Sequence, residues 1–392
     1  MSELVTLFTY NLSSLIAGVY DNTSVGIYNI EEPVLYKSQR RASTYNDVTY
    51  DVIKYNKHLL TPETIGSYGL CRSVILNKDQ QIVSFAPPKS IALNLFLEKY
   101  PSKIPSIIAE EMIEGTMINV FWDGNGDGWE LATRSAVGAQ NMFYLPPNPK
   151  TFFDMFQEAS DQCGLKLENL NKEFCYSFVL QHPENKIVVD VSTPTLYLVA
   201  VYKIRNPSYT VEVVDLHSCV FDMGTVKFPE VYEFDTWDEL KTRFETTDLR
   251  IPGTMIKNLE TGERTKIRNT HYESVRRLRG NQPKLKYQYL VLSKSEKEAE
   301  YLGHFPEHTE QFKEFKEEID NFTCFLYDSY VSCFITKTKL PRDCPYYLMK
   351  TLYSLHNCYI EQHQKITRKY TAQFVHDLHP STLTKVLNGV SL

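Results

Sequence analysis

The feature that most constrains the fold is a change in the spacing of apolar residues near residue 300. Before it, apolar and β-branched residues form short runs broken by turn residues, such as TMINVFWD at 116–123, which is typical of strands. After it, apolar residues recur every three, four or seven positions, as in 312–330, which is typical of amphipathic helices. The sequence therefore predicts an α+β fold over residues 1–291, followed by an all-α C-terminal domain over residues 292–392.

Further elements are predicted within the first domain. The other strand-like segments are 73–85, 129–135, 186–202 and 209–216. Short helices are expected at 90–99 and 149–163, where apolar residues are spaced for one buried helix face.

Size, cysteines and charge exclude several classes of protein. A chain of 392 residues can bury two or three cores without disulfides. Its eight cysteines form no CxxC pair or tight cluster, so neither a zinc ribbon nor a disulfide framework is indicated. No apolar run approaches the roughly 20 residues that span a bilayer. The N-terminus lacks the basic and apolar segments of a secretory signal. We expect a monomeric, cytoplasmic protein without a membrane partner.

The net charge of −6 argues against general attraction to nucleic acid, so any contact must use local basic patches. The sequence also has no GxxxxGK[ST] phosphate loop, which excludes a P-loop kinase.

One short motif points to a particular chemistry. Covalent nucleotidyl transfer uses a lysine amine that attacks the α-phosphate of ATP or GTP. Its signature is K-x-D/E-G, and the stretch EEMIEGT at 110–116 has this form with Met112 in place of the lysine. Glu114 supplies the acidic residue and Gly115 the glycine that permits a tight turn.

This motif and five further blocks together resemble the phage RNA ligase 1 family and its relatives in large DNA viruses. In order between about residues 65 and 290, the blocks are YGLCRSVIL, SFAPPKSI, WELATRSAVGA, YSFVLQHPENKIVV and PGTMIKNLETGERTKIRN. The resemblance implies a nucleotidyltransferase domain of antiparallel sheets, similar to ATP-grasp folds, and a helical C-terminal domain. It also implies an ATP-dependent RNA ligase that joins 5′-phosphate and 3′-hydroxyl RNA ends through lysyl-AMP and RNA-adenylate intermediates, with Mg²⁺ or Mn²⁺.

The resemblance assigns roles to individual residues. The catalytic positions are Met112, Glu114, Lys89, Lys266 and Arg268, and the nucleotide-binding positions are Arg72, Glu111, Ile113, Gly115, Arg134 and Ser135. Cations in such a site neutralise the charge that grows as the phosphorus is attacked. Lys266 and Arg268 are two residues apart on a predicted strand, so both face the same side. Glu114 is expected to face the nucleophile and, through water, a metal; no other metal ligand is assigned.

Three residues depart from the family pattern. A methionine thioether offers no amine, so Met112 cannot form a lysyl-nucleotide. Val179 and Pro252 stand where the third and fourth motifs carry glutamates. Met112 is explained either as a substitution that disables an active ligase, or as a natural feature of a pseudoenzyme that binds nucleotide or RNA ends. We favour the first explanation because the phosphate-binding cations are retained. A third alternative, an mRNA capping guanylyltransferase, prefers GTP and normally carries an OB-fold domain.

A basic run lies at 263–289, where eight basic residues accompany two acidic ones and three tyrosines. Cations interleaved with rings suit a phosphate backbone and its bases. The predicted RNA-binding residues are Arg276, Arg277, Arg279, Lys284 and Lys286. The alternative is a helix face that is simply solvated.

Overall fold

The computed structural model describes residues 5–20, 38–143, 149–219 and 223–390. The chain divides into two compact units, residues 1–274 and 275–392. The division falls within helix α6 (Thr270–Arg279), whereas the predicted boundary after residue 291 lies inside α7 (Leu285–Lys294). Each unit is described by itself.

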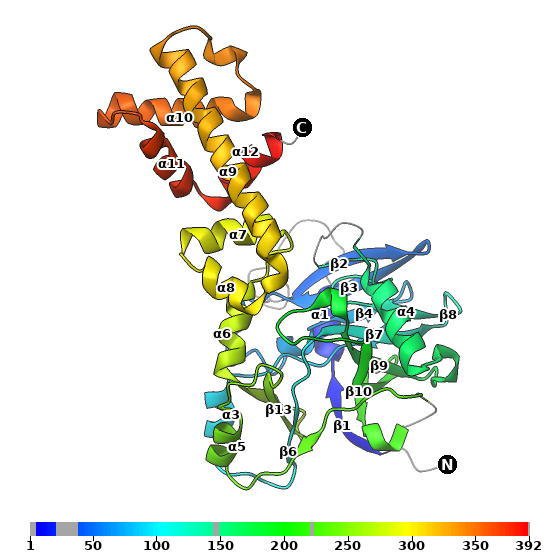
Figure 1. The fold of residues 1–392 in the computed structure, drawn as a ribbon. Helices are drawn as coiled ribbons and strands as arrows, with labels where there is room; N and C mark the ends of the chain where they lie inside the picture. Colours follow the sequence, from blue (N-terminus) through cyan, green and yellow to red (C-terminus); the bar gives the residue numbers. More distant parts are fainter. Residues whose placement is uncertain (1–4, 21–37, 144–148, 220–222, 391–392) are drawn as a thin grey trace. The chain divides into compact units, whose positions relative to one another are not determined.

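The first unit is built mainly from antiparallel sheets, as the alternating apolar runs predict (Figure 1). In order across the six-stranded sheet, the strands are β1 (Thr6–Asn11), β11 (Thr210–Val214), β10 (Thr195–Arg205), β9 (Phe174–Gln181), β7 (Thr116–Asp123) and β8 (Gly128–Ala132). Amphipathic helix α4 (Phe152–Cys163) packs on β9 and β10. Its Phe156 and the sheet residues Ile118 and Phe178 are fully buried in one apolar core.

Two four-stranded sheets complete this unit. The first contains β2 (Ser38–Tyr45), β3 (Val48–Tyr55), β4 (Val74–Leu76) and β5 (Ile82–Phe85). The second contains β12 (Val231–Tyr232), β6 (Ile107–Glu111), β13 (Gly253–Asn258) and β14 (Arg264–Arg268). Further helices among the described residues of this unit are α1 (Ser13–Tyr20), α3 (Leu93–Lys99) and α5 (Trp237–Arg243). A core that includes Phe96 of α3 and Leu240 of α5 covers one face of the second sheet. The opposite face of this sheet carries the candidate site described below.

The second unit is helical in every described element, which confirms the predicted change of structure along the chain. Beyond α7, its helices are α8 (Glu298–His304), α9 (Thr309–Tyr330), α10 (Tyr346–Gln362), α11 (Arg368–Asp377) and α12 (Pro380–Val390). α9 continues into a π-helical turn at Val331–Ile335. Within the described residues, no helix has both the length and the apolar character needed to cross a bilayer.

Most predicted strands of the first unit are present, but the strand expected at 186–202 is wrong in its first half. β10 begins only at Thr195. The preceding residues include Val188 and Val189, whose amides are bound by the carboxylate of Glu114. A side chain has replaced a neighbouring strand as the partner of these backbone groups.

Candidate nucleotide site

Met112 directly follows β6, and its amide donates to the carbonyl of Gly253 on β13 at 3.4 Å. Residues opposite each other on neighbouring strands point to the same face of a sheet. On the face of interest, the rows across β6, β13 and β14 are Ile108–Lys257–Arg264 and then Glu110–Met255–Lys266, followed by Gly253–Arg268 beside Met112. Basic residues therefore recur along this face up to Met112.

Six cations from distant parts of the sequence converge around this face, and we call them the cation cluster. The cluster consists of Arg72, Lys89, Arg134, Arg264, Lys266 and Arg268. Burial, followed by the positive charges of four other members, lowers the pKa of Lys266 to about 7. Burial and neighbouring cations likewise lower the pKa of Lys89, and they lower that of Arg72 to about 10. The structure thus brings together all five of the predicted cations and adds Arg264.

Protein groups satisfy only part of this positive charge. Arg268 forms an ion pair with Glu273 at the start of α6. Arg134 stacks 4.8 Å from the ring centre of Tyr55 and donates to the carbonyl oxygen of Arg72 at 3.3 Å. The buried Nε of Arg264 has no hydrogen-bond partner among the described residues. Buried polar atoms are nearly always hydrogen-bonded, so an orphaned guanidinium nitrogen indicates a place where a ligand atom fits.

The carboxylate of Glu114 is bound by groups of the protein itself, and its predicted role toward the nucleophile and a metal stays a prediction. It is buried, and one oxygen accepts from the amides of Val188 and Val189 at 3.1 and 3.0 Å. The other oxygen accepts from the hydroxyl of Tyr272 at 2.6 Å and again from the amide of Val188 at 3.1 Å. Burial raises the pKa of Glu114 and these hydrogen bonds oppose the rise. We call this arrangement the Glu114 clamp; it fixes the chain before β10 against the turn after Met112.

Position 115 accepts only glycine. Its φ is +156°, and an added Cβ would lie 2.4 Å from the carbonyl oxygen of Leu180. The motif glycine is therefore required by the close approach of β9. Val179, in the same strand, is buried and pairs with Met117 of β7.

The other predicted nucleotide-binding residues have different surroundings. The amide of Glu111 donates to the carbonyl of Glu230 at 2.7 Å, and burial raises the pKa of its side chain. Ser135 accepts a hydrogen bond from Lys54 at 3.1 Å. Ile113 is half-buried within the turn. Among the described residues, no hydrogen bond or ion pair joins these three side chains to the cation cluster, so their role stays a prediction.

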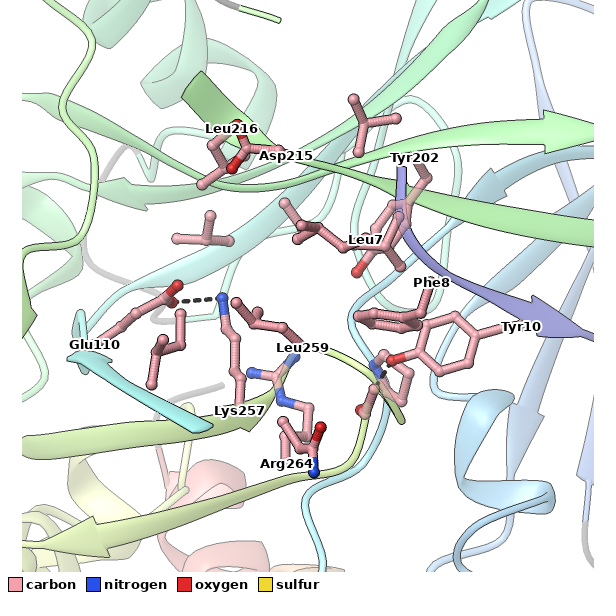
Figure 2. A pocket seen from close by; sticks show the side chains of 18 of the residues that line it. Leu7, Phe8, Tyr10, Glu110, Tyr202, Asp215, Leu216, Lys257, Leu259 and Arg264 are labelled. Carbon is pink, nitrogen blue, oxygen red and sulfur yellow. Dashed lines mark hydrogen bonds and ion pairs between the residues drawn. The ribbon is translucent and has the colours of Figure 1, made fainter. Parts of the chain in front are cut away.

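A cavity of about 260 Å³ lies between the six-stranded sheet and the second four-stranded sheet (Figure 2). Its walls are mostly apolar, with Leu7, Phe8 and Val199 on one side. Arg264 belongs both to this lining and to the cation cluster, so the cavity adjoins the cluster. Sequence reasoning missed Arg264, although it occupies the position two residues before Lys266 and the period of two would have placed it on the same face.

The described residues contain no group of three or more His, Cys, Asp or Glu side chains arranged to hold a metal. Glu114 already has both oxygens engaged, and Val179 and Pro252 supply no carboxylate. The described side chains therefore do not fit a protein-held metal ion.

In the second unit, the predicted RNA-binding residues differ in how far their side chains are exposed. Arg277 and Lys284 are exposed, as is Arg276. In contrast, Arg279 is only 6% exposed and stacks on Phe305, and Lys286 pairs with Glu318 at 2.8 Å. The expected interleaving of rings is also wrong in part, because Tyr272 and Tyr289 are buried at 4% and 3% exposure. These side chains are instead engaged in packing and ion pairing within the chain.

Comparisons with known proteins give one sequence match. No family model matches the chain. Over 113 residues it is 26% identical to an RNA ligase of Rhodothermus phage RM378, which covers 27% of this chain and 24% of that protein. The chain therefore matches about a quarter of the length of this curated relative.

Solved structures give likenesses at low identity. A putative ATP-dependent DNA ligase from Aquifex aeolicus has a TM-score of 0.40 and 14% identity, over 83% of this chain and 78% of that one. Two forms of an archaeal ATP-dependent RNA ligase have TM-scores of 0.39 and 0.40, at 11% and 12% identity. They cover 65% and 71% of this chain, and 62% and 72% of their own.

Proposed function

We propose that the first unit is the nucleotide-binding domain of an ATP-dependent RNA ligase, and that the cation cluster holds the triphosphate beside residue 112. The observation that carries this proposal is the convergence of six cations, three of which, Arg72, Lys89 and Lys266, have a pKa lowered by burial and by the neighbouring positive charges. Charges in a partly buried site interact strongly because the local dielectric is low. A polyanion bound at this place would offset the repulsion among the cations, because each cation would be attracted to the ligand.

The arrangement also suits the length of a nucleotide. The base would occupy the apolar cavity, and the phosphates would extend along the sheet face toward Met112. The four residue-to-residue steps from Ile108 to Met112 span about 13 Å of extended chain. Arg264, at the junction, would then give its orphaned Nε an acceptor on the ligand.

The implied chemistry has three steps. A lysine at position 112 would attack the α-phosphorus and release pyrophosphate; the AMP would pass to an RNA 5′-phosphate; a 3′-hydroxyl would then attack and release AMP. Lys266 and Arg268 would stabilise the charge that develops on the phosphoryl oxygens. With Met112 the first step cannot occur, because the thioether sulfur has no proton to lose and no amine to offer.

The resemblance to RNA ligases also implies a divalent metal. The described side chains do not fit a protein-held metal ion. Mg²⁺ commonly binds through substrate phosphates and water, so a metal would enter with the nucleotide.

A second candidate is a pseudoenzyme that binds nucleotide without sealing RNA. It is favoured by the combination of Met112, Val179 and Pro252 with a Glu114 carboxylate that is committed to the clamp. Both candidates predict binding of ATP by the chain as it stands.

The deciding experiment restores the amine. The Met112→Lys variant is incubated with ATP labelled at the α-phosphate, and the protein is analysed under denaturing conditions for a covalent adduct. An adduct that is lost in the Met112→Lys, Lys266→Met double variant supports the ligase. A restored lysine that binds ATP but forms no adduct rejects the ligase and leaves the pseudoenzyme. Preference of the adduct for GTP over ATP would instead indicate a guanylyltransferase.

A further inference from the structure

Two buried thiols of the helical unit lie in contact with each other. Cys333 belongs to the π-helical turn Val331–Ile335 that continues α9, and Cys344 follows the 3₁₀ turn Pro341–Asp343, shortly before α10 begins. Their Sγ atoms are 3.6 Å apart, and the two residues are only 6% and 5% exposed. The S–S bond of a disulfide is about 2.05 Å long, so the sulfur atoms would need to approach each other by roughly 1.5 Å to form one.

The chain that joins the two thiols is an exposed segment, residues 335–343. Every residue of this segment except Pro341 is exposed. Even its apolar side chains Ile335 and Leu340 are 62% and 50% exposed, so the segment buries little surface. Segments with few buried contacts open more readily than the packed helices beside them. Such opening would give a small reagent access to both thiols.

Packing alone does not account for the contact between the thiols. A free cysteine often serves in a core as a small apolar group, but that role does not require a second thiol against it. A bond between Cys333 and Cys344 would hold the end of α9 to the start of α10 across the exposed segment. Burial, followed by the hydrogen bond with Cys344, raises the pKa of Cys333, so this thiol reacts slowly while the segment is closed.

We propose that Cys333 and Cys344 form a site of reversible oxidation, at which glutathione disulfide converts the two thiols into one intrachain disulfide. One protein thiolate attacks a sulfur of glutathione disulfide and releases one glutathione thiolate; the second protein thiolate then attacks the protein sulfur of the mixed disulfide and releases the other. The protein loses two electrons and two protons, and glutathione disulfide gains them as two thiols. The inference concerns the second unit and does not depend on the proposed function.

Peptide mapping tests the disulfide directly. The full chain carrying Cys324→Ala is incubated with glutathione disulfide, alkylated to block free thiols, unfolded in urea and digested with trypsin without reduction. The exposed Cys324 is removed because no lysine or arginine separates it from Cys333, so that one tryptic peptide would contain both. We expect a linked pair of peptides that contain Cys333 and Cys344, and we expect dithiothreitol to separate them.

Limited proteolysis of the folded chain measures the consequence for the exposed segment. Lys337, Lys339 and Arg342 are exposed trypsin sites within the ring that the disulfide would close. We expect oxidation to slow cleavage at these sites by about tenfold, since a short closed ring restricts the open conformations that a protease requires. Dithiothreitol should restore the original rate.

Matched variants separate the proposed pair from other cysteines. Cys333→Ala, or Cys344→Ala if the first variant fails to fold, should abolish both the linked peptides and the slower cleavage, whereas Cys324→Ala should retain both. If the two thiols remain free for alkylation after exposure to glutathione disulfide, the proposal is wrong and only the packing role stands. Stable glutathione adducts, or a link from either residue to another cysteine, would also contradict it.

Discussion

The half-buried cation cluster and the buried Glu114 clamp are two charged regions of the same unit, and they differ in how their charges are satisfied. In the clamp, both oxygens of one carboxylate are bound by backbone amides and a tyrosine hydroxyl. In the cluster, six cations repel one another, and the Nε of Arg264 lacks a partner among the described residues. A charged group whose hydrogen-bond partners all come from the chain indicates a structural role, whereas a charged group that lacks a partner indicates a ligand-binding role. The clamp should therefore control stability and the cluster should control binding.

The largest expected effect is on stability and comes from the clamp. Glu114→Ala leaves two backbone amides and the hydroxyl of Tyr272 without their acceptor in a buried site. We expect the free energy of unfolding to fall by about 3 to 5 kcal/mol, since each unsatisfied buried group costs roughly 1 to 3 kcal/mol. Urea denaturation measures the loss. Glu168→Ala, at an exposed position, serves as the control; a loss no larger than in the control would contradict the assigned role.

The next effect is on binding and comes from the cluster. Lys266→Met should weaken tripolyphosphate or ATP binding by about 10- to 100-fold, since a charge-assisted hydrogen bond contributes roughly 1.5 to 3 kcal/mol. The free energy of unfolding should stay equal or rise, because a repelled, buried charge has been removed. Calorimetry and urea denaturation measure the two quantities. Unchanged affinity would remove Lys266 from the site, while Lys241→Met tests for a general effect of charge.

The pH dependence sharpens the contrast further. Burial and neighbouring cations lower the pKa of Lys266 from 10.5 to about 7. Below pH 7 the lysine is protonated in both the folded and unfolded states. Between pH 7 and 10.5 the unfolded chain binds the additional proton, so the lysine's contribution to the free energy of unfolding rises with pH.

Phosphate binding should have the opposite slope. A bound anion favours the charged amine, so binding takes up a proton and the affinity falls as the pH rises from 7.5 to 9. Calorimetry in buffers of different ionisation enthalpy measures this uptake. Lys266→Arg keeps the charge throughout this range and should flatten the profile; a profile as steep in the arginine variant would assign the proton to another group.

The smallest expected effect again concerns the clamp. Tyr272→Phe removes one donor to Glu114, at 2.6 Å, and leaves both backbone amides bound. We expect the free energy of unfolding to fall by about 1 kcal/mol, with ATP affinity changed less than twofold. Differential scanning calorimetry and ligand titration check the two parts. A larger effect on affinity than on stability would place Tyr272 in the nucleotide site.

Much of the cluster was predictable from the sequence because alternation along one strand is a local property. Lys266 and Arg268 share a face by spacing alone, and the same rule extends to Arg264. The roles of all five predicted cations came from the family resemblance, and no local pattern connects Arg72, Lys89 or Arg134 to β14. The change from strands to helices was likewise predictable from the spacing of apolar residues.

The clamp and the cavity were not predictable because their partners are remote in sequence. Glu114 is bound by groups 74 and 158 residues away, and a K-x-D/E-G motif carries no information about them. The ion pair between Glu110 and Lys257 in the cavity wall requires the register of β6 and β13. For Arg279 and Tyr289, composition suggested a basic surface with rings, but helix packing buried both side chains.

Helix α6 touches both regions through consecutive residues. Its Tyr272 donates to Glu114, and its Glu273 pairs with Arg268. A phosphate that binds Arg268 competes with Glu273 for the same guanidinium. Nucleotide binding would therefore weaken the Arg268–Glu273 ion pair in the first turn of α6, while the hydrogen bond from Tyr272 to Glu114 would remain. Amide hydrogen exchange across residues 270–274 should then become faster on addition of tripolyphosphate. The stability of the first turn of α6 would thus depend on whether the site is occupied.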